Sequence, residues 1–178
     1  MLALARQLAG KPQLRKGVLF IAFAGEEIGL LGSTYYVNQP LLPLNRAVLM
    51  INMDMIGRIR EGKVIVSGAG EHSATRTVLQ KLDRISPLEL KLDDPGVYGS
   101  SDHTAFQAKS IPVWFFFSGL HADYHKISDT WDKINARDAA RLLNLISSAV
   151  IEVSDSTVPL QLAAPGKIFT HESNLGGR

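Results

Sequence analysis

Acidic side chains and imidazoles follow the apolar runs of this 178-residue sequence. Glu26 and Glu27 come directly after the run VLFIAFA, and Asp54 follows the run RAVLMINM. After the run VWFFF, the segment SGLHADYHKISDT supplies four more candidates, which are His121, Asp123, His125 and Asp129. Because functional groups gather beyond the carboxyl ends of strands in parallel α/β sheets, we expect these side chains to meet at one sheet edge. The chain has no cysteine, and carboxylates with imidazoles are the ligands of zinc or a similar hydrolytic metal.

Asp102 and His103 lie in the segment YGSSDH, directly before the helical segment TAFQAK. Two interpretations stay open for this pair: a role in orienting a metal-binding imidazole, or a purely structural role. More generally, an acid at a strand end is often solvated or caps the next helix, and a single loop histidine often lies at the surface. A Ser-His-Asp hydrolase is disfavoured, because adjacent residues point in different directions and the sequence has no G-x-S-x-G turn. The helical metalloprotease signature H-E-x-x-H is also absent.

Composition indicates a single globular domain. The sequence is 46% hydrophobic and 20% charged, and 19 Lys and Arg against 17 Asp and Glu give a formal charge of +2. Neither sign forms a block, so charge points to no nucleic-acid or membrane partner. The longest apolar runs are far shorter than the roughly 20 residues of a membrane-spanning helix. The N-terminal segment also lacks the regions of a signal peptide.

Short apolar runs predict five strands, at residues 17–24, 46–53, 63–67, 88–92 and 111–117. The first, second and last runs are almost continuously apolar, which is typical of strands covered on both faces. The runs KVIVS and LELKL alternate instead, and we expect them nearer a sheet edge.

Helical spacing of apolar residues predicts helices at 28–38, 71–85 and 135–154, and a short one at the N-terminus that stops at Gly10. Asn135 is the expected N-cap of the last helix, with Asp138 in its first turn. Strands separated by helices predict an α/β sandwich with a largely parallel sheet. We assign residues 1–156 to one domain and residues 157–178 to a loosely held tail.

Four motifs in order resemble one family. The segments LFIAFAGEEIGLLGS, INMDMIG, YGSSDHTAF and IPVWFFFSGLHADYHKISDTWDKIN are similar to those of the zinc exopeptidases of metallopeptidase family twenty-eight, aminopeptidases with two co-catalytic zinc ions. The resemblance runs from the first residues to about residue 153. It implies a three-layer α/β sandwich with a mostly parallel mixed sheet. It also implies a hydrolase that removes N-terminal residues from peptide substrates.

The resemblance implies a role for each motif residue. Glu26 matches the general base, and Glu27 and His125 match two ligands of one zinc ion. Asp54 matches a ligand of the other zinc ion. Chemistry agrees with this division, because zinc lowers the pKa of a bound water to about 7 while a neighbouring carboxylate takes its proton.

Further positions take supporting roles under the same resemblance. Tyr98 matches a tyrosine that helps to stabilise the oxyanion in some members. Met55 matches a position near the pocket for the first side chain of the substrate. Asp102 and Asp129 would suit carboxylates that orient a ligating imidazole through its other nitrogen.

The sequence departs from the family pattern upstream of the glutamate pair. The family has a His-x-Asp and an Asp-Asn there, and this sequence has neither. We therefore expect the chain to correspond to the C-terminal part of the catalytic domain, and to bind fewer than two zinc ions by itself. Missing upstream strands would leave a sheet edge exposed, which favours self-association.

Two alternative functions stay open. The chain as it stands would be a catalytically silent α/β module if the upstream ligands are absent. The same scaffold also supports carboxypeptidase or glutaminyl cyclase chemistry, although GLLGS and NMDMIG favour a peptidase. Members of the family are often secreted or periplasmic, and this chain contains no signal peptide.

Overall fold

The computed structural model describes residues 1–11, 14–69, 73–92 and 101–156. Its helices are α1 (Leu2–Ala9), α2 (Leu31–Asn38), α3 (Ser73–Asp83), α4 (His103–Gln107) and α5 (Ala136–Asp155). Its strands are β1 (Met50–Asp54), β2 (Lys63–Ser67), β3 (Glu89–Leu92) and β4 (Val113–Phe117), and three 3-10 turns are η1 (Leu44–Arg46), η2 (Ile56–Arg58) and η3 (Trp131–Lys133). The expected tail, residues 157–178, lies outside the described residues.

The four strands form one mixed sheet in the order β1-β4-β2-β3. β1 pairs with β4 in parallel, β2 pairs with β3 in parallel, and β4 runs antiparallel to β2. The carboxyl ends of β1 and β4 therefore share one end of the sheet, and those of β2 and β3 point to the other end. This pairing confirms the predicted α/β fold with a mostly parallel mixed sheet.

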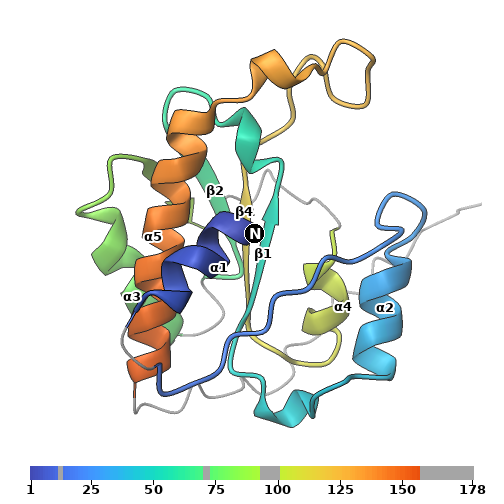
Figure 1. The fold of residues 1–178 in the computed structure, drawn as a ribbon, viewed down its shortest axis with the longest axis vertical. Helices are drawn as coiled ribbons and strands as arrows, with labels where there is room; N and C mark the ends of the chain where they lie inside the picture. The colour runs from blue at the N-terminus through green and yellow to red at the C-terminus, as the bar shows by residue number, and fades with distance from the viewer. Residues whose placement is uncertain (12–13, 70–72, 93–100, 157–178) are drawn as a thin grey trace, which may run out of the picture.

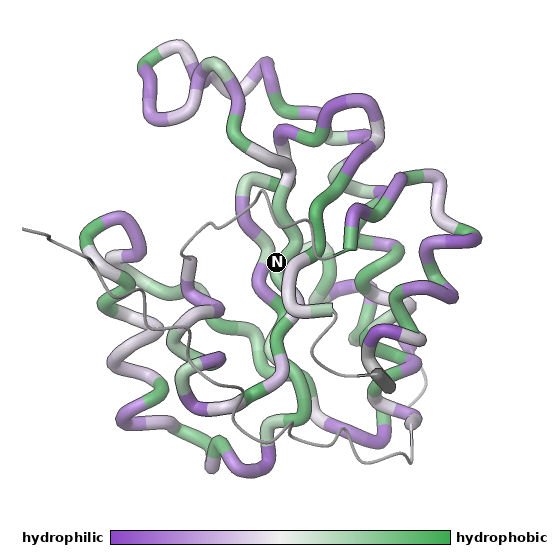
Figure 2. The backbone as a smooth tube through the Cα atoms, turned by 180° about the vertical axis from the view of Figure 1, so that it is seen from behind, coloured by the Kyte–Doolittle hydropathy of each residue, from purple (hydrophilic) through white to green (hydrophobic). Residues whose placement is uncertain are grey.

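Helices cover both faces of the sheet. α1, α3 and α5 lie on one side, and α2 and α4 lie on the other (Figure 1). The side chains of β4 alternate between these layers: Trp114 and Phe116 join the core under α1 and α5, whereas Val113 packs with α2 and α4. Hydrophobic stretches run through the centre of the molecule, and the peripheral turns are mostly hydrophilic (Figure 2). In the described ranges, no helix is long and apolar enough to cross a membrane.

Two predictions about the strands are wrong. Residues 17–24 are extended but form no ladder within the described part of the chain, since a strand needs a pairing partner for its backbone groups. Phe20 and Phe23 still pack against the two hydrophobic cores, while Val18 and Leu19 are exposed. The apolar run thus predicted burial correctly for only some of its side chains.

The edge assignments are also partly wrong. β3 lies at an edge as expected, but β2 lies between β4 and β3, and β1 lies at an edge of the described sheet. The alternation in β2 arises because Val64 and Val66 face the core while the residues between them are less buried. Alternation therefore reports which face is covered and does not report the position within the sheet. β4 is buried along its whole length, as its continuous apolar run predicts.

Helix termini follow local hydrogen bonds. The Oδ1 atom of Asn135 accepts the backbone N–H of Asp138 at 3.1 Å, which confirms the predicted N-cap of α5. α2 begins at Leu31, three residues later than predicted, because the carbonyl of Glu26 accepts the N–H groups of Gly29 and Leu30 at 3.1 and 2.9 Å. Residues 26–30 consequently form a separate turn that carries the glutamate pair.

Lys16 anchors the extended segment that leads to this turn. Its ammonium donates to the carbonyls of Val153, Ser154 and Ser156 at 3.1, 2.9 and 2.7 Å. These carbonyls belong to the C-terminal end of α5, where free carbonyls need partners and a positive charge is favourable. The last turn of α5 contains no basic residue of its own, so Lys16 supplies that charge from a distant part of the sequence.

Candidate metallopeptidase site

The carboxyl ends of β1 and β4 lie side by side. Asp54, the last residue of β1, is in register with Phe117, the last residue of β4. Just beyond them, the Ser118 hydroxyl donates to the carbonyl of Met55 at 2.6 Å. Met55 has a positive φ of 53°, an uncommon conformation for a side chain of this size, and turns the chain sharply into η2. The two segments that hold predicted site residues therefore leave the sheet together.

Glu27 and His125 meet across the site. The Oε1 atom of Glu27 lies 3.0 Å from the Nε2 atom of His125, although 98 residues separate them. Both side chains are more than half exposed. The His125 ring stacks on Tyr124, with ring centroids 3.8 Å apart. The two residues that the resemblance assigns to one zinc ion are thus in direct contact.

A buried serine orients Asp54. The Ser101 hydroxyl donates to the Oδ2 atom of Asp54 at 3.0 Å and accepts a hydrogen bond from the side-chain amide of Asn52 at 2.9 Å. Ser101 is only 3% exposed. Because a hydroxyl has one proton to donate, the bond from Asn52 leaves that proton free for the aspartate. The sequence analysis did not single out Ser101, and its place next to Asp102 was the only signal.

Glu26 lies among other carboxylates. Burial raises the pKa of Glu26, and the nearby charges of Asp54, Glu27 and Asp102 raise it further. Ser101 can offset part of the effect when its single hydroxyl proton points to Glu26 instead of Asp54, because a hydrogen bond to the carboxylate lowers this pKa. A carboxylate with a raised pKa holds a proton more readily, as a general base must. A concentration of negative charge of this kind also attracts cations.

Tyr124 faces the same carboxylates and was missed by the sequence analysis. Burial raises the pKa of its hydroxyl, and the charges of Glu27, Glu26 and Asp54 raise it further. The phenol therefore stays protonated and can donate a hydrogen bond. Its position beside His125 in the sequence was the signal that could have identified it.

Asp129 and Asp102 differ in their surroundings. Asp129 forms an ion pair with Arg58 and lies 3.8 Å from the Nε2 atom of His121, so the imidazole beside it is His121 and not His125. One side-chain oxygen of Asp102 is buried and has no hydrogen-bond partner among the described residues. Tyr98, the predicted oxyanion residue, lies outside the described residues.

The donor types at this site suit zinc, but their convergence is incomplete. Carboxylate and imidazole groups are common zinc ligands, and Glu27 with His125 form a contacting pair. In the ranges that the structure describes, however, no three histidine, aspartate or glutamate side chains converge where a metal ion would bind. The geometry therefore supports two donors for one ion, with Asp54 held separately by Ser101.

His103 is buried in the fold next to β4. It is 5% exposed and its ring stacks on Phe115 with centroids 4.2 Å apart. Burial lowers the pKa of His103 from its ordinary 6.5 to about 4. The folded protein therefore keeps this imidazole neutral at neutral pH, although the unfolded chain would protonate it more readily.

This difference predicts a pH-dependent stability. As pH falls from about 6.5 to about 4, the unfolded chain binds a proton at His103 that the folded chain does not, so the free energy of unfolding should fall by on the order of 3 kcal/mol. Below about pH 4 this contribution should fall no further, because both states are then protonated. Urea unfolding of the wild type and of His103→Phe across this range measures the effect. Parallel pH profiles for the two proteins would contradict it.

Sequence comparisons match the chain to one peptidase family and to proteins that are named aminopeptidases. Residues 1–150 match the family described as Peptidase family M28. Aminopeptidase YwaD of Bacillus subtilis is 31% identical over 166 residues, which cover 85% of this chain and 35% of that protein. Leucine aminopeptidase 2 of Trichophyton rubrum is 31% identical over 172 residues, which cover 81% of this chain and 35% of that protein. The chain thus spans about a third of the length of these relatives.

Structural comparisons agree. BSAP, a zinc aminopeptidase from Bacillus subtilis, superposes with a TM-score of 0.71 at 28% identity, covering 93% of this chain and 43% of that structure. The LapA aminopeptidase of Legionella pneumophila shares the fold with a TM-score of 0.68 at 20% identity, covering 84% of this chain and 42% of that structure. The ordered motifs, the mixed sheet and these matches lead to one conclusion: the chain belongs to peptidase family M28.

Proposed function

We propose that these residues form part of a zinc aminopeptidase site that hydrolyses N-terminal peptide bonds. Glu27 and His125 hold one zinc ion, Asp54 binds a second, and Glu26 is the general base. The observation that carries this proposal is the 3.0 Å contact between Glu27 and His125, next to a glutamate whose pKa is raised. Relatives named as aminopeptidases, and a solved neighbour named as a zinc aminopeptidase, support the substrate class and the metal.

The side chains divide the chemistry between them. When bound, zinc supplies a Lewis acid that polarises the peptide carbonyl and makes water easier to deprotonate. Glu26 is not one of the contacting donor pair, so its carboxylate is free to accept the proton and deliver it to the leaving amine. The hydrogen bond from Ser101 keeps Asp54 oriented. Met55 and Tyr98 keep the pocket and oxyanion roles that the family pattern implies.

Zinc binding tests this proposal without depending on turnover. We expect isothermal titration of the chain with zinc chloride to show binding that weakens by about tenfold or more in Glu27→Gln and in His125→Asn, because each loses one ligand. Glu152→Gln is the matched control, since Glu152 pairs with Lys81 away from the site. Unchanged zinc affinity in both ligand variants would remove the assignment.

A further inference from the structure

The segment that carries His125 is exposed and shaped by local turns. We call residues 119–130 the His125 loop. Its backbone hydrogen bonds include Tyr124 N–H to His121 at 3.0 Å, Lys126 N–H to Asp123 at 2.9 Å and Asp129 N–H to Lys126 at 3.0 Å. These bonds fold the loop but do not attach it to the sheet. Side chains from elsewhere fix the position of the loop further, among them Arg60, which donates to the carbonyl of Leu120 at 2.8 Å.

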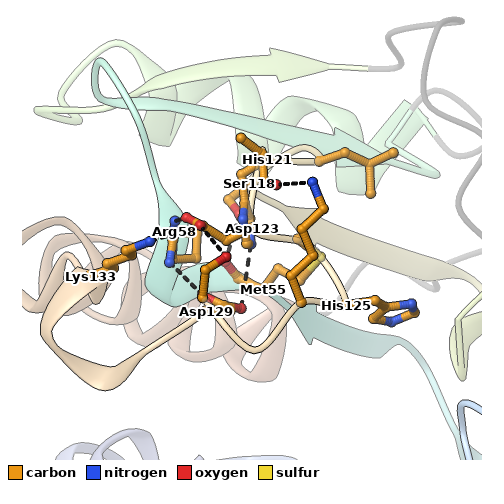
Figure 3. A network of polar contacts seen from close by, with 12 residues as sticks. Met55, Arg58, Ser118, His121, Asp123, His125, Asp129 and Lys133 are labelled. Carbon is orange, nitrogen blue, oxygen red and sulfur yellow. Dashed lines mark hydrogen bonds and ion pairs between the residues drawn. The ribbon is translucent and has the colours of Figure 1, made fainter.

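Arg58 reaches the loop at two points. Its Nη2 atom donates to the Oδ2 atom of Asp123 at 2.8 Å, and its Nη1 atom donates to Asp129. Arg58 and Asp123 are 16% and 18% exposed, so this pair is shielded from solvent more than a typical surface pair. Asp123 precedes His125 by two residues and Asp129 follows it by four. Figure 3 shows Arg58 between Asp123 and Asp129, and Lys133 forms a further ion pair with Asp123.

The same arginine is tied to the other half of the site. Arg58 is the last residue of η2 and follows Asp54 by four residues. Between them, the carbonyl of Met55 accepts a hydrogen bond from the hydroxyl of Ser118, the residue just before the loop. By contrast, the contact between His125 and Glu27 joins two exposed side chains, and exposed ion pairs contribute little to holding a geometry. The partly buried arginine is therefore better placed to fix the loop than the site contact itself.

We propose that Arg58 is a positioning residue that holds the His125 loop, through Asp123 and Asp129, so that the imidazole meets Glu27. The proposal rests on the proposed function in one respect only, which is that the contact of His125 with Glu27 forms a zinc site. The two ion pairs hold the loop at one residue before His125 and at one residue after it. Loss of either pair should therefore loosen the loop on that side of His125, and loss of both should loosen it most.

The first experiment uses the metal-free chain. In the wild type, Glu27→Gln should shift the NMR signals of the His125 ring, whereas in an Arg58→Met background the same substitution should leave them unchanged. Amide hydrogen exchange measured by mass spectrometry should rise by about tenfold in residues 119–130 of Arg58→Met and stay unchanged in β4 and α5. Arg141→Met is the matched control, because Arg141 pairs with Asp138 on α5 and does not contact the loop.

Two milder variants keep the test decisive if Arg58→Met fails to fold. Arg58→Lys can reach one carboxylate but lacks the fork that binds two, and Asp129→Asn removes one arm. In each variant, the amide hydrogen exchange rate of residues 119–130 should lie between the wild-type rate and the rate expected when both ion pairs are lost. Wild-type hydrogen exchange of the loop in both variants would overturn the proposal. A second contradicting result would be NMR signals of the His125 ring that respond to Glu27→Gln in an Arg58→Lys background as fully as they do in the wild type.

Zinc titration of the same proteins separates this proposal from the proposed function. Arg58→Met should weaken zinc binding by about tenfold, as is typical when a residue supporting a ligand is lost. Loosened loop exchange with wild-type zinc affinity would overturn the positioning role at the metal site. If Glu27→Gln and His125→Asn both bind zinc as tightly as the wild type, the proposed function fails. The metal-free NMR and exchange results then still decide whether Arg58 holds the contact of His125 with Glu27.

Discussion

Glu26→Gln is expected to lower kcat for release of an N-terminal residue by about a hundredfold or more while zinc binding is retained. The amide has nearly the same shape as the carboxylate but cannot accept the proton that hydrolysis must move. The pKa of Glu26 is raised by burial and by Asp54, Glu27 and Asp102, which favours transient binding of a proton at this carboxylate. Loss of that group should therefore affect the chemical step and leave KM nearly unchanged.

The measurement combines hydrolysis of an amino-acid p-nitroanilide with zinc titration. Because the chain spans about a third of the curated relatives it matches, turnover is measured on a longer polypeptide that contains these residues, with the 178-residue chain in parallel. Glu61→Gln is the control, since Glu61 is an exposed glutamate that pairs with Lys63. Full turnover in Glu26→Gln would remove Glu26 as the base, and loss of zinc together with turnover would indicate that it is a ligand.

Local patterns predicted much of this fold. The cap of α5 could be identified because Asn135 and Asp138 are three residues apart, and the bond between them depends on little else. β4 could be identified because a strand buried on both faces needs a continuous apolar run. The failure at residues 17–24 has the opposite cause. Hydrophobicity shows that a segment prefers burial, whereas a strand also requires a partner for its backbone, which local sequence does not contain.

The same distinction between local pattern and long-range contact applies to the candidate site. Glu27 and His125 could be predicted to lie together because family motifs carry both of them, although residues 17–24 before Glu27 form no strand in the described part of the chain. The residues that support the side chains of the site and of its loop could not be predicted in this way. Ser101 lies 47 residues from Asp54, and Arg58 lies 65 residues from Asp123. Serines and arginines are common at protein surfaces, so only the folded arrangement shows which of them support a functional side chain.

Gly32→Ala is expected to destabilise the protein, against the usual effect of this change in a helix. A Cβ at Gly32 would lie 2.7 Å from both the backbone nitrogen and the backbone oxygen of Ala24, and the Gly32 N–H already donates to that oxygen at 2.8 Å. Backbone atoms cannot move aside alone, so α2 would have to shift away from the turn that carries Glu26 and Glu27. Replacing glycine by alanine in a helix normally stabilises by about 1 kcal/mol.

The clash should outweigh that gain. Inserting a methyl group into a closely packed position costs about 1 to 3 kcal/mol, and here the opposing atoms are backbone, so we expect a net loss of about 2 kcal/mol in the free energy of unfolding. Gly17→Ala is the control, in the segment that precedes Ala24, because a Cβ at Gly17 would meet nothing within 4 Å. Urea unfolding of both variants measures the difference, and zinc titration shows whether the glutamate turn has moved. A Gly32→Ala protein as stable as the wild type would mean that α2 can move away from Ala24 without a loss of stability. The hydrogen bonds to the Glu26 carbonyl, and not the close packing of Gly32 against Ala24, would then determine the position of the turn at residues 26–30.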